Sequence, residues 1–137
     1  MKTVKNTKLK KLEFDVLETL RIERKMLSKK NEEITPEELS FILKHAESGS
    51  PLGEFDYGLY LLLYEHNEKE AEKWWTKSFY HCNGFGLWKQ SGIFAYLGDE
   101  YYEWSMRCLR RSAWRQFPIA KRMLKEMKEH PFKFPEA

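Results

Sequence analysis

The feature that most constrains this fold is the close spacing of helix-starting and helix-ending signals along the chain. Residues 35–38, Thr-Pro-Glu-Glu, have the form of a capping box with proline at the first helical position. Gly49 can close the helix that follows, and residues 50–51, Ser-Pro, can open the next. Asn67, with Glu70 three residues later, is a further N-terminal capping pattern. These signals predict several short helices joined by tight turns.

Apolar residues at intervals of three and four complete the helical pattern. Leu12, Val16, Leu20 and Met26 or Leu27 lie on one stripe of a first amphipathic helix. Residues 1–8 lack this periodicity and are expected to be poorly ordered. Residues 83–86, Asn-Gly-Phe-Gly, are expected to break the chain between two helices. The first predicted helix begins at residue 9 or 12 and ends near residue 30. The others cover residues 36–48, 51–64, 67–82, 87–97, 100–115 and 118 to just before 130.

Composition agrees with an all-α fold. The chain has 137 residues, of which 42% are hydrophobic and 15% aromatic, and this apolar content excludes an intrinsically disordered protein. Only 7 glycines and 5 prolines are present, which argues against collagenous and loop-rich folds. Cys82 and Cys108 have neither the number nor the spacing of a disulfide framework or a zinc site. We expect both to be small buried hydrophobic residues.

The predicted helices repeat with a period of thirty-odd residues. The position numbers of Trp74 and Trp104 differ by 30. Similar offsets separate three further pairs, which are Lys77 and Arg107, Ala71 and Tyr101 and, at an offset of 34, Gly58 and Gly92. A period of this length is typical of helix-turn-helix solenoid units. Trp74 and Trp104 are therefore predicted to pack between helices.

Part of the chain resembles a known repeat family. Residues 46–50, Ala-Glu-Ser-Gly-Ser, are followed by residues 57–59, Tyr-Gly-Leu, and then by Ala71, Trp74 and residues 77–78, Lys-Ser. This order resembles the Sel-one-like repeat, a relative of the tetratricopeptide repeat. A second copy over residues 79–108 is degenerate, and a third from Leu109 keeps only the spacing. The resemblance implies antiparallel helix pairs in an adaptor that binds proteins or peptides and has no activity of its own.

We therefore expect an all-α fold, namely a short α-solenoid of antiparallel helix pairs with about seven helices and an N-terminal amphipathic helix. The expected organisation is a basic N-terminal segment with this helix over residues 1–34, a helical repeat domain over residues 35–130, and a C-terminal tail over residues 131–137. The first and last helices would cap so short a solenoid.

Charge is segregated along the chain although the net charge is only +3. Residues 1–30 carry ten Lys or Arg against four Asp or Glu, residues 31–73 carry three against eleven, and residues 74–137 carry eleven against six. An acidic middle between basic ends can attract partners of opposite charge, or a second copy of the chain as a homodimer. The alternative is that these charges only form solvated helix faces.

The candidate partner-binding residues lie on two kinds of surface. Arg107, Arg110 and Trp114 fall on the side of their helix opposite the predicted core, and Trp and Arg are enriched in interface hot spots. The alternative is that Arg107 pairs with Glu103 and that Trp114 packs under the next helix. By the family pattern the third and fifth helices line the inner side of the stack, which adds the aromatic candidates Tyr60, Tyr64, Trp88 and Tyr96.

No catalytic or cofactor-binding motif is present in the sequence. His-Glu-x-x-His, Gly-x-Ser-x-Gly, P-loop and dinucleotide patterns are absent, and His81 and Cys82 are adjacent, so a helix directs them about 100° apart. The scattered histidines and cysteines have no metal-ligand spacing. We expect no enzyme activity, no metal and no cofactor.

Two function classes remain. The favoured one is a non-catalytic protein-protein interaction module, an adaptor. The alternative is a nucleic-acid-binding protein that uses the lysines of the N-terminus and the arginines of the C-terminal helices, with Trp114 available to stack on a base. The longest apolar run, residues 59–64, is far shorter than the roughly 20 residues that cross a bilayer, and no secretory signal is recognised. We therefore expect a cytoplasmic protein with no membrane partner.

Overall fold

The computed structural model describes the backbone of residues 2–129 and the side chains of residues 15–128. Over this backbone range the chain is all-helical, without a strand, and it divides into two compact units, residues 1–80 and residues 81–137. The elements are α1 (Lys2–Leu27), α2 (Pro36–Glu47), α3 (Pro51–Leu63), α4 (Glu68–His81), α5 (Gly84–Leu97), the short 3-10 helix η1 (Asp99–Tyr101), α6 (Tyr102–Trp114) and α7 (Pro118–Glu129). The expected tail, residues 131–137, lies outside the described residues.

The predicted helix signals are confirmed. At the start of α2, Thr35 Oγ1 accepts from the backbone N–H of Glu38 at 3.1 Å, and the Glu38 carboxylate accepts from the backbone N–H of Thr35 at 2.9 Å. Gly49 closes the α2 end with a φ of 88°, a conformation that favours glycine. Ser50 caps α3, and Asn67 Oδ1 accepts from the backbone N–H of Glu70 at the start of α4.

The predicted boundaries of the fifth and first helices are wrong, and the first helix also ends at Leu27, before its expected end near residue 30. The fifth helix begins at Gly84 and not at Leu87, because Asn83 Oδ1 accepts from the backbone N–H of Gly86 at 2.7 Å and caps the helix. Residues 83–86 therefore start a helix instead of separating two. The first helix begins at Lys2, so that residues 2–8, expected to be poorly ordered, are helical in their backbone.

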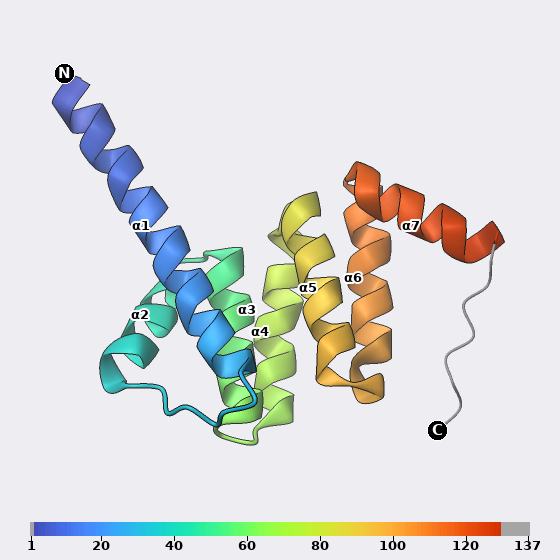
Figure 1. Ribbon diagram of the computed structural model, residues 1–137, viewed down its shortest axis with the longest axis horizontal. Coiled ribbons are helices and arrows are strands. Elements are labelled where there is room, and N and C mark those ends of the chain that lie inside the picture. The colour runs from blue at the N-terminus through green and yellow to red at the C-terminus, as the bar shows by residue number, and fades with distance from the viewer. Residues whose placement is uncertain (1, 130–137) are drawn as a thin grey trace. The chain divides into compact units, whose positions relative to one another are not determined.

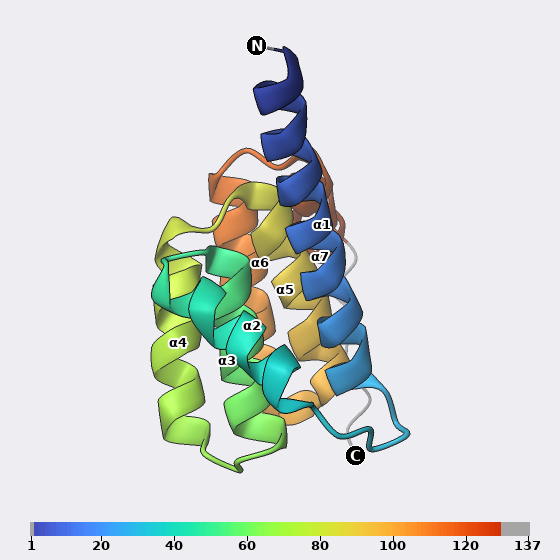
Figure 2. The same cartoon turned by 90° about the vertical axis from the view of Figure 1, so that its left-hand side faces the viewer.

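The buried face of α1 also differs from the predicted stripe. Met26 of the predicted stripe is buried, but so is Ile22, which lies off the stripe, whereas Val16 is 49% exposed and Leu20 is only half-buried. Leu12 lies outside the described side chains. The second half of α1 packs against α3, beside α2 (Figures 1 and 2). Arg21 and Lys25 of α1 both form ion pairs with Glu38 of α2. These ion pairs restrain the rotation of α1 about its axis, and the apolar pattern of the sequence does not report them.

Trp75 of α4 is the large aromatic side chain at the centre of the unit formed by residues 1–80. It is 1% exposed, and its indole lies against the backbone at Gly58 of α3 so closely that a Cβ at Gly58 would overlap the ring. Burial of such an indole contributes roughly 4–6 kcal/mol before entropy losses. Trp74, the predicted packing residue, is half-buried and meets Tyr57 edge-on at 5.2 Å between ring centroids.

Two helix pairs are antiparallel and share one register. Between α3 and α4, Ser78 Oγ donates to the carbonyl of Pro51 at 2.8 Å, and Gly58 lies against the backbone of Ala71. The two contacts are therefore seven residues apart on α3 and also seven residues apart on α4. Between α5 and α6 the same spacing recurs. Its first contact joins the Ser112 hydroxyl to the Gly84 carbonyl at 2.6 Å, and its second joins Ser91 and Ser105, each of which donates to the other's carbonyl at 2.8 Å.

These contacts set the offset between equivalent positions of the two pairs, since Gly84 follows Pro51 by 33 and Ser112 follows Ser78 by 34. The pairs predicted at an offset of 30 are therefore not equivalent in the backbone, whereas the offset of 34 between Gly58 and Gly92 agrees with the observed register. Moving a residue by four positions is about one helical turn and leaves it on nearly the same face, so sequence periodicity could not distinguish 30 from 34. What recurs at an offset of 30 is an indole with a cation above it, formed by Lys77 over Trp74 and by the equivalent pair on α6.

The unit formed by residues 81–137 has its own core. Met106 and Leu109 of α6 pack with Ala120 of α7, and the half-buried side chains around them are Trp88, Tyr102, Ala113, Phe117, Leu124 and Met127. In Figure 1, α5 and α6 lie side by side and α7 leaves the C-terminal end of α6. Cys82 and Cys108 are both buried thiols, as predicted. Burial raises the pKa of the Cys108 thiol to about 12.

Candidate interaction surfaces

The first candidate surface is the outer face of α6. Trp114, on its last turn, is 66% exposed, so the alternative in which it packs under the next helix is wrong. The guanidinium groups of Arg111 and Arg115 lie 5.0 and 5.8 Å from its ring centroid. Arg110, one turn before Trp114, is exposed. A large indole therefore stands in solvent among cations.

Arg107 extends this surface toward the middle of α6. Its guanidinium lies over the Trp104 ring at 4.6 Å, and that ring stacks on Phe94 of α5 at 5.5 Å. Arg107, Arg110 and Trp114 are spaced three and four residues apart, which places them on one stripe about 10 Å long. We call this stripe, with Arg111 and Arg115 beside it, the α6 surface.

The other two aromatic candidates of this unit have different settings. Trp88 lies in a ring cluster with Phe85 and Phe117, with centroids 5.9 and 5.7 Å away, and its Nε1–H donates to Met123 Sδ at 3.3 Å. Trp88 therefore packs between α5 and α7 and stabilises their contact. Tyr96, on the last turn of α5, is 55% exposed.

Tyr60 and Tyr64 belong to a second surface, in the unit formed by residues 1–80. With Tyr57 they form a run of nearly parallel rings along α3. Centroids are 6.3 Å apart from Tyr57 to Tyr60 and 5.4 Å from Tyr60 to Tyr64, with interplanar angles of 11° and 12°. All three rings are half-buried. We call this run the tyrosine ladder.

Carboxylates surround the tyrosine ladder. The Tyr60 hydroxyl donates to Glu65 at 3.1 Å, whereas the Tyr64 hydroxyl donates to the backbone carbonyl of Glu32 at 2.7 Å. Burial, followed by the negative charges of Glu65, Glu47 and Glu70, raises the pKa of Tyr57. The pKa of Tyr60 is raised by burial and by Glu65. Burial also raises the pKa of Tyr64, and the positive charge of Lys25 opposes this shift. The electrostatic environment of the ladder is therefore negative at Tyr57 and Tyr60 and mixed at Tyr64.

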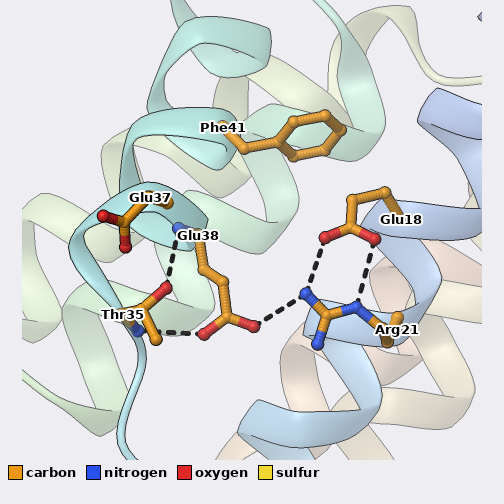
Figure 3. Close-up of a pocket in the computed structure, with 6 residues that line it drawn as sticks. All are labelled: Glu18, Arg21, Thr35, Glu37, Glu38 and Phe41. Atoms are coloured by element: carbon orange, nitrogen blue, oxygen red, sulfur yellow. Dashed lines mark hydrogen bonds and ion pairs between the residues drawn. The ribbon is translucent and has the colours of Figure 1, made fainter.

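A cavity of about 450 Å³ lies between α1 and α2, lined by Glu18, Arg21, Thr35, Glu37, Glu38 and Phe41. Figure 3 shows Arg21 between two carboxylates, with its Nη2 2.6 Å from Glu18 and 2.8 Å from Glu38. Its guanidinium charge is thus already compensated within the protein. The ion pairs that line the cavity join α1 to α2, and they leave no uncompensated positive charge among these lining residues for an anion to bind.

Glu38 of α2 makes the contacts that join α2 to α1. Its carboxylate is only 8% exposed and accepts from Arg21 at 2.8 Å, from Lys25 at 2.8 Å and from the backbone N–H of Thr35 at 2.9 Å. Burial opposes ionisation, but these three donors outweigh it and lower the pKa of Glu38 to about 2. The capping box was predictable from the sequence, whereas the two cationic partners on α1 carry no sequence signal.

The structure offers no metal centre within the part that it describes. Among the described residues no three His, Cys, Asp or Glu side chains are grouped so that they could hold a metal ion. None of the helices within residues 2–129 combines the length and the apolar character needed to cross a bilayer.

Comparison of the chain with protein-family models, with curated proteins and with solved structures found no match. The resemblance to the Sel-one-like repeat therefore rests on the residues quoted for it.

Proposed function

We propose that the protein is a non-catalytic interaction module, an adaptor with the helix pairs of a short α-solenoid, and that it binds an acidic segment of another protein through the α6 surface. The observation that carries this proposal is Trp114, 66% exposed between Arg111 and Arg115. A side chain of this size costs free energy when water surrounds it, unless a partner covers it.

The magnitudes favour an interface. Covering the exposed two-thirds of an indole buries roughly 100–165 Å², which contributes about 2–4 kcal/mol. Arginine guanidinium groups bind carboxylates in a bidentate manner, and the Arg107 guanidinium already lies over the Trp104 ring. A partner with an apolar side chain flanked by Asp or Glu would satisfy both features.

The repeated register of the two helix pairs supports the solenoid part of the proposal. Side-chain hydrogen bonds from Ser78 and Ser112 tie the second helix of each pair to the first residue of its partner. Repeat modules of this kind present exposed helix faces for binding partners.

The experiment is a pull-down that compares the parent chain with Trp114→Ala and Arg110→Glu. We expect a partner recovered by the parent to be lost, or reduced about 30-fold in affinity, with either variant. Tyr96→Ala and Lys125→Glu are matched controls, since they remove an exposed aromatic ring and reverse an exposed cation elsewhere in the same unit. Unchanged recovery by both α6 variants would contradict the proposal.

Nucleic-acid binding is the second candidate, because an exposed indole among guanidinium groups can also stack on a base. The eleven acidic residues between positions 31 and 73 oppose it. A salt titration separates the two functions. Loss of binding by about a thousandfold between roughly 50 and 200 mM salt indicates phosphate contacts, whereas a shallow dependence indicates a protein partner.

A further inference from the structure

The tyrosine ladder is a second surface, and the proposed function makes no use of it. Its rings belong to the unit of residues 1–80, whereas the α6 surface belongs to residues 81–137. The ring centroids follow one another at 6.3 and 5.4 Å along α3, and each ring keeps part of its area in contact with solvent. Tyr57, Tyr60 and Tyr64 therefore present a continuous aromatic strip about two helical turns long.

Carboxylates outnumber cations around this strip, although Lys25 acts on Tyr64 and Glu70 pairs with Lys73 at 3.1 Å. Residues 31–73 carry eleven acidic side chains against three lysines. Glu47 and Glu65, which act on the Tyr57 phenol, are exposed, and Glu70 is half-buried. Aromatic faces and carboxylates both attract cations, so the two features favour the same kind of ligand.

The protein already makes the contact that such a ligand would make. The Lys77 ammonium lies 4.1 Å from the centroid of the Trp74 ring, and Trp74 meets Tyr57 edge-on at the end of the ladder. An aromatic ring next to the ladder thus already holds a lysine. Tyr60 and Tyr64 continue the row of aromatic rings from Tyr57 along α3.

From this charge complementarity we infer that the tyrosine ladder binds an extended, lysine- and arginine-rich segment of another protein. Side chains on the same side of an extended segment recur about every 6.6 Å, close to the ring spacing of 5.4–6.3 Å. Cationic side chains at alternate positions lie along the solvent-facing edge of the rings. Glu47 and Glu65 pair with them, and Glu70 exchanges its ion pair with Lys73 for one with the segment. The α6 surface and the tyrosine ladder then take partners of opposite charge.

The test titrates the ¹⁵N-labelled full chain with a fluorescent twelve-residue peptide of alternating lysine and serine. A peptide of alternating glutamate and serine is the control. We expect the lysine peptide to bind and to shift amide resonances of α3 and of the first turn of α4, but not those of α6. The glutamate peptide should leave α3 unshifted.

The variant that isolates the charge is the triple change Glu47→Gln, Glu65→Gln and Glu70→Gln. Three ion pairs at the surface are together worth about tenfold in affinity at low salt, so we expect a loss of this size. The matched control removes three exposed carboxylates from the other unit and gives the same net charge, through Glu100→Gln, Glu103→Gln and Glu126→Gln. This control should bind the peptide with unchanged affinity.

A ring variant completes the test. Tyr60→Leu keeps an apolar side chain but removes the aromatic face, and we expect a loss of about twofold to fivefold with unchanged helical content by circular dichroism. Equal affinities for the parent and the α3-side triple variant would overturn the inference, as would resonance shifts confined to other helices. A parent that sediments as a dimer, with the triple variant a monomer, would also overturn it, because the occupant would then be a second copy.

Discussion

Glu38→Gln tests whether the buried carboxylate holds α1 on α2. The substitution keeps the size of the side chain but removes the charge that accepts from Arg21 and Lys25, both at 2.8 Å. The pKa of Glu38 is lowered from 4.5 to about 2, and each tenfold change in an ionisation constant corresponds to about 1.4 kcal/mol of folding free energy. The upper limit is therefore about 3 kcal/mol. Since Arg21 is half-exposed, we expect a loss of about 1–3 kcal/mol.

The measurement is urea unfolding at pH 7, followed by helical circular dichroism, on the parent, on Glu38→Gln and on Glu37→Gln. Glu37 is the matched control because it is exposed on the same first turn of α2. We expect Glu37→Gln to change the free energy of unfolding by less than about 0.5 kcal/mol. A similar small change for Glu38→Gln would refute the reasoning, because the donors around the carboxylate would then contribute nothing to stability.

The same pKa sets the pH dependence. The folded-state pKa of Glu38, about 2, lies below its ordinary value of 4.5, so its stabilising contribution is present above pH 4.5. That contribution is lost as the pH falls from about 4.5 through 2. The parent should therefore lose stability in this range more steeply than Glu38→Gln, with the two curves converging at the acid end. Parallel curves would contradict the assignment.

Three further predictions concern packing. Gly58→Ala should destabilise the chain by about 1–3 kcal/mol in urea unfolding, because the added methyl group overlaps the Trp75 ring, whereas Gly92→Ala, with open space around it, should be neutral or stabilising. Ser112→Ala should cost about 1–3 kcal/mol in the same assay, since the carbonyl at the start of α5 loses its donor. Cys108, with a pKa raised to about 12, should react with an aromatic disulfide reagent at pH 8 only when the protein is unfolded.

The helix boundaries were predictable because their signals are local. A cap such as Thr35 or Asn67 satisfies backbone N–H groups only three residues away, so the sequence contains both partners of each hydrogen bond. Asn83 is instructive, because the same local rule applied there as well. The neighbouring glycines favoured a break over a cap, and α5 was therefore expected to start three residues late.

The features that were not predictable depend on partners distant in the sequence. The rotation of α1 and the depressed pKa of Glu38 both follow from ion pairs across 13 and 17 residues, and no periodicity reports them. The choice between Trp74 and Trp75 as the buried indole depends on the glycine at position 58 of the facing helix. An adjacent pair of tryptophans on one helix leaves that choice open.

Residue type alone does not distinguish an aromatic side chain that packs between helices from one that is available to a partner. Sequence reasoning grouped Tyr60, Tyr64, Trp88 and Tyr96 because all are aromatic and lie on the third and fifth helices. The structure assigns Trp88 to packing between α5 and α7, and places Tyr60 and Tyr64 in a parallel ring series beside acidic side chains. Since the Tyr60 hydroxyl donates to Glu65, that carboxylate orients the phenol and supplies negative charge at once. The electrostatic setting of a ring, and not its presence, therefore determines which partner it can bind.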